Sequence, residues 1–81
     1  MDYRKVIQIE EELKVLKKQK RIVRKQAIMK RAELMMNSFT GRIPSAEKAL
    51  TEVKILEQQE RDILDTVAVK STELKKAMAS A

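Results

Sequence analysis

The sequence predicts an all-α protein, an antiparallel two-helix hairpin of the coiled-coil type. Apolar positions recur in steps of three and four in both halves of the chain, which is the spacing of coiled-coil a and d positions. In the first half the positions of this repeat, two of which hold lysine, are Val6, Ile9, Leu13, Leu16, Lys20, Val23, Ala27, Lys30 and Leu34. In the second half they are Ala46, Ala49, Val53, Leu56, Glu60, Ile63, Val67, Lys70, Leu74 and Ala77. We call these two sets together the seam.

The two halves of the seam match when the chain folds back on itself. If paired positions sum to about 80, Leu13 lies opposite Val67, and the charged positions Lys20 and Glu60 lie opposite each other. A polar residue in a coiled-coil seam usually fixes the register at some cost in stability. We therefore expect Lys20 and Glu60 to form a register pair that approaches within the seam.

The first helix is expected to span about residues 2–36, and no Gly or Pro interrupts it. Asp2 is suited to cap its first amide groups. The connection, about residues 37–45, holds the only Gly and the only Pro of the chain. Gly41 can adopt a left-handed conformation there, which favours a reversal of the chain.

The second helix is expected to span about residues 46–78, with Ser45 as its N-cap. Phe39 is interpreted as a plug that closes the turn end of the hairpin. Lys30 and Lys70 have no acid opposite them in the seam, so we expect their ammonium groups to extend into water along apolar stems. The whole chain, residues 1–81, is predicted to form a single domain.

The composition argues against catalysis and against bound cofactors. The 81 residues contain no His and no Cys, a single Gly and only two aromatic residues, Tyr3 and Phe39. Nucleophilic triads, thiolate metal sites and phosphate-cradling loops therefore lack their usual residues. We expect no enzyme activity, cofactor, metal or small-molecule substrate. Because signal-peptide and membrane-spanning patterns are also missing, we expect a soluble, cytoplasmic protein that makes no membrane contact.

Apolar residues outside the seam predict association with another helical surface. They recur every seven residues on the first helix, and a comparable stripe runs along the opposite flank on the second. The candidate partner face comprises Val15, Ile22, Met29, Met36, Leu50 and Leu64. Such ribbons have no partner in a two-helix hairpin, which favours dimerisation into a four-helix bundle or docking on a helical protein. The alternative is that they are ordinary surface aliphatics.

The formal net charge is +6, and the first half carries most of the cations. A stripe at helical spacing comprises Lys14, Lys17, Lys18, Arg21, Arg24, Lys25 and Arg31. Such a stripe can contact nucleic-acid phosphates or an acidic protein. Alternatively, it is a solvated face that pairs with acids of the second half, for example Arg24 with Glu57.

These observations favour a noncatalytic protein–protein interaction module, such as a small adaptor, assembly factor or regulator. Its expected partners are a second copy of the chain, another helical protein, or both. The alternative function is nonspecific nucleic-acid binding by the basic stripe of the first helix.

Overall fold

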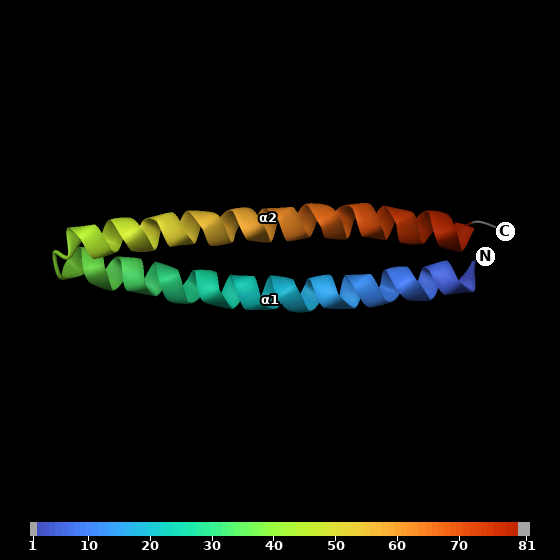
Figure 1. Ribbon diagram of the computed structural model, residues 1–81, viewed down its shortest axis with the longest axis horizontal. Helices are drawn as coiled ribbons and strands as arrows, with labels where there is room; N and C mark the ends of the chain where they lie inside the picture. Colours follow the sequence, from blue (N-terminus) through green and yellow to red (C-terminus); the bar gives the residue numbers. More distant parts are fainter. Residues whose placement is uncertain (1, 80–81) are drawn as a thin grey trace.

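The computed structural model of the protein describes residues 2–79 and is an all-α helical hairpin (Figure 1). Helix α1 spans Tyr3–Phe39 and helix α2 spans Ile43–Ala79, each of 37 residues. The molecule is a rod with extents of 62 × 15 × 12 Å. Its radius of gyration is 18.1 Å, against about 12 Å for a compact globule of this length. The predicted fold class is therefore confirmed.

Helix α1 begins as predicted and ends later than predicted. Asp2 is its N-cap, and the Asp2 carboxylate accepts a hydrogen bond of 3.2 Å from the Lys5 amide. At the other end, the helix continues three residues past the expected limit of 36. The Ser38 hydroxyl donates to the carbonyl oxygen of Leu34 at 2.8 Å. Because this bond keeps the hydroxyl within the helix, a short polar residue that usually breaks helices is tolerated in the last turn.

The connection is shorter than predicted and consists of residues 40–42. Gly41 has a φ angle of +73°, the left-handed conformation that closes helix C-termini. The Arg42 amide donates to the carbonyl oxygen of Asn37 at 2.9 Å. Helix α2 then begins at Ile43, so the prediction that it starts at 46 with Ser45 as N-cap is wrong. Pro44 fits into the first turn because amides there have no intrahelical acceptor.

Phe39 does not close the end of the hairpin. Its side chain is 83% exposed at the end of α1. Phe39 instead borders a surface hollow of about 570 Å³ on the side of α1, together with Arg31, Leu34, Met35 and Ser38. The interpretation of Phe39 as a plug is therefore wrong.

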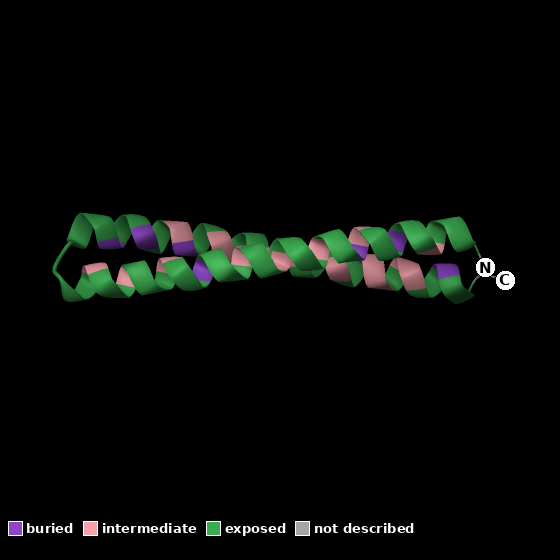
Figure 2. Ribbon diagram, turned by 90° about the horizontal axis from the view of Figure 1, so that it is seen from below, coloured by how far each residue is buried: buried purple, intermediate pink, exposed green. Residues whose placement is uncertain are grey.

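The predicted seam is confirmed along the whole rod. Every seam position of both helices is buried or half-buried. Full burial is confined to the two ends, as Figure 2 shows. Ile9 and Leu13 pack with Ala77 near the termini, and Ala27, Ala46, Ala49 and Val53 are the buried residues nearer the turn. The middle of the rod, around Lys20, has only half-buried seam positions.

Candidate interaction surfaces

Two ion pairs that join the helices define one face of the rod. Lys70 Nζ lies 2.6 Å from Oε2 of Glu12, and Lys30 Nζ lies 2.7 Å from Oε2 of Glu52. Glu12 directly precedes the seam position Leu13, which places this face on one flank of the seam. Most side chains around and between the ion pairs are uncharged. We call this surface the glutamine face; its uncharged residues are Gln8, Val15, Gln19, Ile22, Gln26, Met29, Met36, Ile55, Gln59, Thr66 and Val69.

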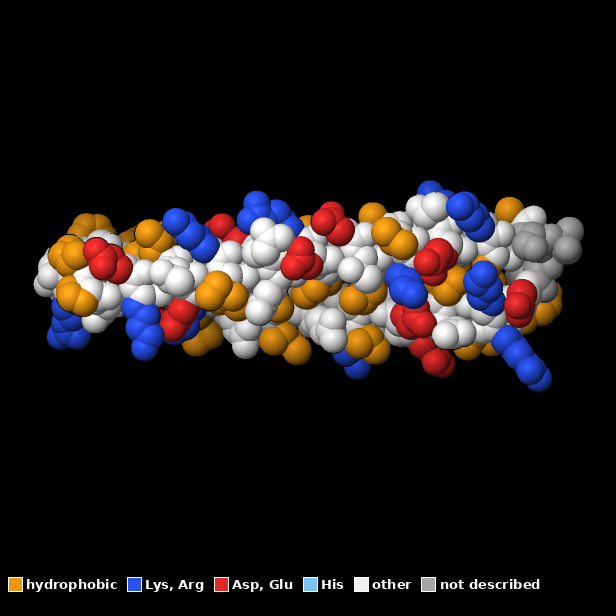
Figure 3. All heavy atoms as spheres, turned by 45° about the horizontal axis from the view of Figure 1, so that its top comes forward, with side chains coloured by type: hydrophobic (Ala, Val, Ile, Leu, Met, Phe, Trp, Pro, Cys, Tyr) orange, Lys and Arg blue, Asp and Glu red, His pale blue; other side chains and the backbone are white. Residues whose placement is uncertain are grey.

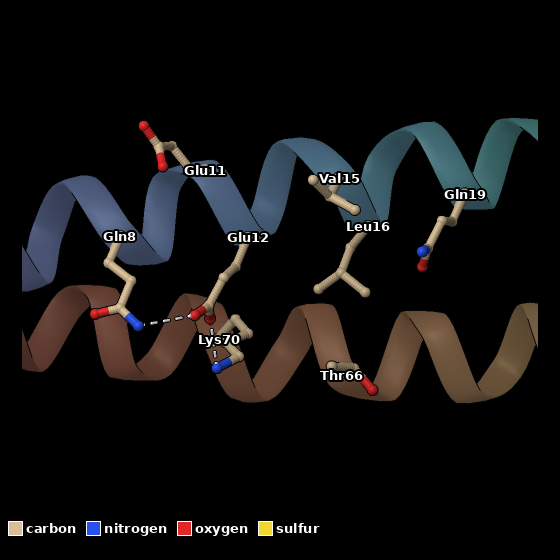
Figure 4. A pocket seen from close by; sticks show the side chains of 8 residues that line it. All are labelled: Gln8, Glu11, Glu12, Val15, Leu16, Gln19, Thr66 and Lys70. Carbon is tan, nitrogen blue, oxygen red and sulfur yellow. Dashed lines mark hydrogen bonds and ion pairs between the residues drawn. The ribbon is translucent and has the colours of Figure 1, made fainter.

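Two hollows open on the glutamine face. The first has a volume of about 460 Å³ and is lined by Gln8, Glu11, Glu12, Val15, Leu16, Gln19, Thr66 and Lys70 (Figure 4). The second has a volume of about 310 Å³ and is lined by Gln26, Lys30, Glu52, Ile55 and Leu56. In both hollows, an aliphatic floor from the seam is bordered by a Lys–Glu ion pair.

The residues that line the two hollows are related by a constant offset in the sequence. Each residue that lines the second hollow stands 40 positions from one that lines the first, as Leu56 does from Leu16. The sequence carries the same period: Glu-Leu-Lys-Val-Leu at 12–16 corresponds to Glu-Val-Lys-Ile-Leu at 52–56. This internal repeat was not predicted from the seam positions, and it accounts for the paired hollows. The hairpin therefore has approximate twofold symmetry about the middle of the rod.

The same symmetry relates two clusters of three charges. Lys70 pairs with Glu12 and, at 3.7 Å, with Glu73. Its equivalent Lys30 pairs with Glu52 and, at 3.0 Å, with Glu33. The expectation that the two lysines extend freely into water is wrong. The acids that bind them lie beside the seam, whereas only positions within it were compared.

These contacts shift the pKa values of both lysines and of two acids. The hydrogen bond from Lys70 lowers the pKa of Glu12 below its ordinary value of 4.5, and Glu12 in turn raises the pKa of Lys70 above 10.5. The hydrogen bond from Lys30 likewise lowers the pKa of Glu52. The pKa of Lys30 is raised by Glu52 first and by Glu33 second. Both clusters thus favour their charged forms.

The candidate partner face divides between the two flanks of the rod. Val15, Ile22, Met29 and Met36 lie on the glutamine face and are 54 to 69% exposed in the single chain. Leu50 and Leu64 lie on the opposite flank, at 41% and 42% exposure. The predicted burial of these side chains concerns an assembly, and it stays a prediction.

Sequence reasoning missed two residues of the glutamine face. Ile55 and Val69 of α2 are 53% and 58% exposed. Ile55 is the repeat equivalent of Val15, and Val69 is the repeat equivalent of Met29. With them, the apolar row continues across both helices. Figure 3 shows hydrophobic side chains reaching the surface between charged ones along the whole rod.

The opposite flank, which we call the basic face, holds the predicted basic stripe. Arg31 Nη2 lies 3.1 Å from Oε1 of Glu57, and Arg24 Nε lies 4.0 Å from Oε1 of Glu60. The example that we expected, Arg24 with Glu57, is therefore wrong, because Glu57 forms its ion pair with Arg31, which lies about two turns nearer the connection. The remaining stripe residues form no ion pair within 4.0 Å among residues 2–79; they are Lys14, Lys17, Lys18, Arg21 and Lys25.

Two cations of α2 extend the basic face and were missed in the sequence. Arg61 lies one turn from Glu57, and Lys54 lies one turn from it in the other direction, so both share its side of α2. Pairing positions that sum to about 80 brings Arg61 level with Arg21. Only the fold shows this proximity, since the two residues are distant in the chain.

The predicted register pair is present in position but not as an ion pair. Lys20 and Glu60 are both half-buried seam residues. Within residues 2–79 these two residues form no ion pair with each other at 4.0 Å or less. The Glu60 carboxylate forms its ion pair with Arg24 instead. Lys20 lines a surface hollow with Lys17 and Arg21.

No group of three potential metal ligands occurs within residues 2–79. Neither α1 nor α2 contains a stretch of the length and hydrophobicity that a membrane crossing requires. No protein-family model, curated protein or solved structure matches this chain. The two faces of the rod are therefore the features on which functional inference rests.

Proposed function

We propose that the protein is a noncatalytic protein–protein interaction module of the adaptor or assembly-factor kind. Its glutamine face packs against the same face of a second copy, and the two hairpins form a four-helix bundle. The observation that carries this proposal is the row of six exposed aliphatic side chains on that face. The row comprises Val15, Ile22, Met29, Met36, Ile55 and Val69.

The gain from covering this row is comparable to the cost of association. Burying a Val, Ile or Met side chain completely is worth roughly 1.5–3 kcal/mol, so a half-exposed one contributes about 1 kcal/mol more when covered. Six such side chains on each of two copies contribute about 12 kcal/mol in total. Association costs about 4–15 kcal/mol, which makes a reversible dimer the expected outcome.

The dimensions of the rod favour a partner of the same length. A stable interface buries about 800 Å² on each partner, and one side of a rod of 62 × 15 Å offers about 900 Å². Nearly the whole side must therefore be covered. A second copy meets this requirement, and the approximate twofold symmetry of the face suits an isologous contact.

The distribution of charge selects the glutamine face over the basic one. On the glutamine face, Lys30 and Lys70 are paired with acids, and α1 contributes no other Lys or Arg to it. Helix α2 adds only Lys48 and Lys76, near its two ends, with Asp62 between them. If two basic faces met, the unpaired cations of both copies would repel each other. A heterologous helical protein is the alternative occupant of the glutamine face, where it too would meet fewer unpaired cations than on the basic face.

The test compares two matched double variants by sedimentation equilibrium. Ile22→Glu with Met29→Glu changes the glutamine face, where these side chains are 57% and 69% exposed. Ile28→Glu with Met35→Glu changes the basic face at 57% and 61% exposure, with the same residue types and the same change in net charge. We expect the first variant to be monomeric and the second to dimerise like the wild type.

Two outcomes would contradict the proposal in different ways. A wild-type protein that stays monomeric at high concentration would overturn self-association. If that monomer co-purified with a helical protein from its native host, and the Ile22 and Met29 variant did not, the glutamine face would serve a heterologous partner. Equal effects of the two double variants would remove any special role of the glutamine face.

A further inference from the structure

We propose that the basic face is a binding site for the phosphate backbone of a nucleic-acid duplex. This inference goes beyond the proposed interaction function because it concerns the opposite flank of the rod. It needs only the folded hairpin, so it holds for one copy and for a dimer alike. A dimer joined through the glutamine faces would present one such site on each outer side.

The cations of α1 form a continuous surface. Lys17, Lys20, Arg21 and Arg24 line one surface hollow, and Lys14, Lys17, Lys18 and Arg21 line the next. The two hollows share Lys17 and Arg21, so the positive charges adjoin without interruption. From residue 14 to residue 25 the helix rises by about 17 Å. A duplex carries one negative charge per roughly 1.7 Å of its axis, so its charges are spaced closely enough to meet every one of these cations.

The second helix completes the site. Arg61 and Lys54 reach the same flank from α2, beside the stripe of α1. Arg61, which lies level with Arg21 on the other helix, adds charge that an isolated α1 helix would not carry. The site is therefore a property of the hairpin and depends on its fold.

The acids of the protein leave most of this charge unneutralised. Glu57 and Glu60 bond with Arg31 and Arg24 at the turn side of the face. Within residues 2–79, no acid lies within 4.0 Å of the charged group of Lys14, Lys17, Lys18, Arg21 or Lys25. If the stripe served only the hairpin, its central cations would have acid partners on α2. Their place on α2 is instead occupied by Arg61.

No aromatic side chain lies among the cations of the basic face, which favours a duplex over a single strand as the ligand. Proteins that bind single strands stack bases on aromatic rings. The only aromatic residues, Tyr3 and Phe39, lie at opposite ends of α1, away from the cations. Contacts on this face are therefore limited to phosphates, which position a protein on a duplex without reading its sequence.

The experiment measures binding of a fluorescent duplex DNA of roughly 20 base pairs by anisotropy, between about 50 and 200 mM salt. The site variant is Arg21→Gln with Arg61→Gln, which removes one cation from each helix. The matched control is Lys48→Gln with Lys76→Gln, which removes the same charge from positions on the other flank. Circular dichroism establishes that both variants keep their helices, as expected for exposed Gln.

We expect the wild type to bind with a steep dependence on salt. The site variant should lose about tenfold or more in affinity at low salt, and its salt slope should fall by about 1.8, or 0.9 for each lost phosphate contact. The control variant should bind within about twofold of the wild type. Arg21→Lys with Arg61→Lys should keep most of the affinity, because the charge remains.

Three results would overturn the proposal. The first is a wild-type protein that shows no salt-dependent binding. The second is an equal loss in the site variant and the control, which would reduce the effect to net charge. The third is preferential binding of polyglutamate over duplex at matched charge, which would assign the face to an acidic protein.

Discussion

Ile22 and Ile28 lie six residues apart on α1 and are equally exposed, at 57% each. Ile22 lies one turn from Gln19 and Gln26, on the glutamine face. Ile28 lies one turn from Arg24 and Arg31, on the basic face. The two side chains are therefore equally exposed, but one has uncharged neighbours and the other has cationic neighbours.

This comparison shows that exposure alone does not determine what an apolar residue can contact. A second copy can cover Ile22 without bringing unpaired charges together. Covering Ile28 in the same way would bury cations against cations, which costs far more than the aliphatic contact contributes. The chemistry of the neighbouring positions thus separates an association surface from an electrostatic one.

The largest expected change in the free energy of unfolding comes from the seam, because both faces depend on the packing of the two helices. We expect Leu13→Ala to lower the free energy of unfolding by about 2–3 kcal/mol, because it removes a buried side chain from the packed end of the rod. Ile28→Ala should stay within about 0.5 kcal/mol of the wild type. Urea unfolding monitored by circular dichroism measures both.

Ile22→Ala should fall between these two variants. Its cost should shrink towards that of Ile28→Ala as the protein is diluted, since the covering copy then dissociates. A cost for Ile22→Ala that does not change with protein concentration would indicate that no second copy covers the glutamine face.

A smaller effect is expected from pH, and it involves only the glutamine face. The pKa values of Glu12 and Glu52 are lowered, so their contribution is present above pH 4.5 and is lost as the pH falls through the lower, folded-state values. The pKa values of Lys30 and Lys70 are raised, so their contribution is present below pH 10.5 and is lost as the pH rises through the raised values.

Thermal melts across the pH range should therefore be highest between these two limits. Glu12→Gln with Glu52→Gln should reduce the part of the acid limb that these carboxylates supply. An acid limb unchanged in this variant would show that other carboxylates cause it.

The smallest effect tests the internal repeat. Glu12→Gln and Glu52→Gln should lower the melting temperature by similar amounts, because each acid forms an ion pair with the equivalent lysine. Glu10→Gln is the control, since Glu10 is exposed and forms no ion pair within residues 2–79. Unequal shifts for the two repeat-related variants would show that the two clusters are not energetically equivalent.

The seam could be predicted residue by residue, because burial along a helix depends mainly on period, and the sequence displays the period directly. The end of α1 could not be predicted as well. Ser38 and Thr40 are helix breakers by composition, yet their hydroxyls bond to carbonyl groups one turn earlier. That local competition is decided by geometry and not by residue type.

The charges beside the seam were harder to predict than the seam itself. Comparing seam positions alone placed Glu60 opposite Lys20, but long side chains reach neighbouring positions, and Glu60 lies near Arg24. The pairs of Lys30 and Lys70 were missed for the same reason. A comparison of the chain with itself, shifted by 40 residues, would have shown that these clusters occur twice.

The most direct test of the difference between the two faces uses the absence of cysteine from the natural chain. Ile22→Cys and Ile28→Cys each introduce a unique thiol, and its alkylation rate under reducing conditions is measured across a series of protein concentrations. We predict that the rate for Ile22→Cys falls as the concentration rises, whereas the rate for Ile28→Cys stays constant. Equal rates for the two thiols at every concentration would contradict the assignment of association to the glutamine face.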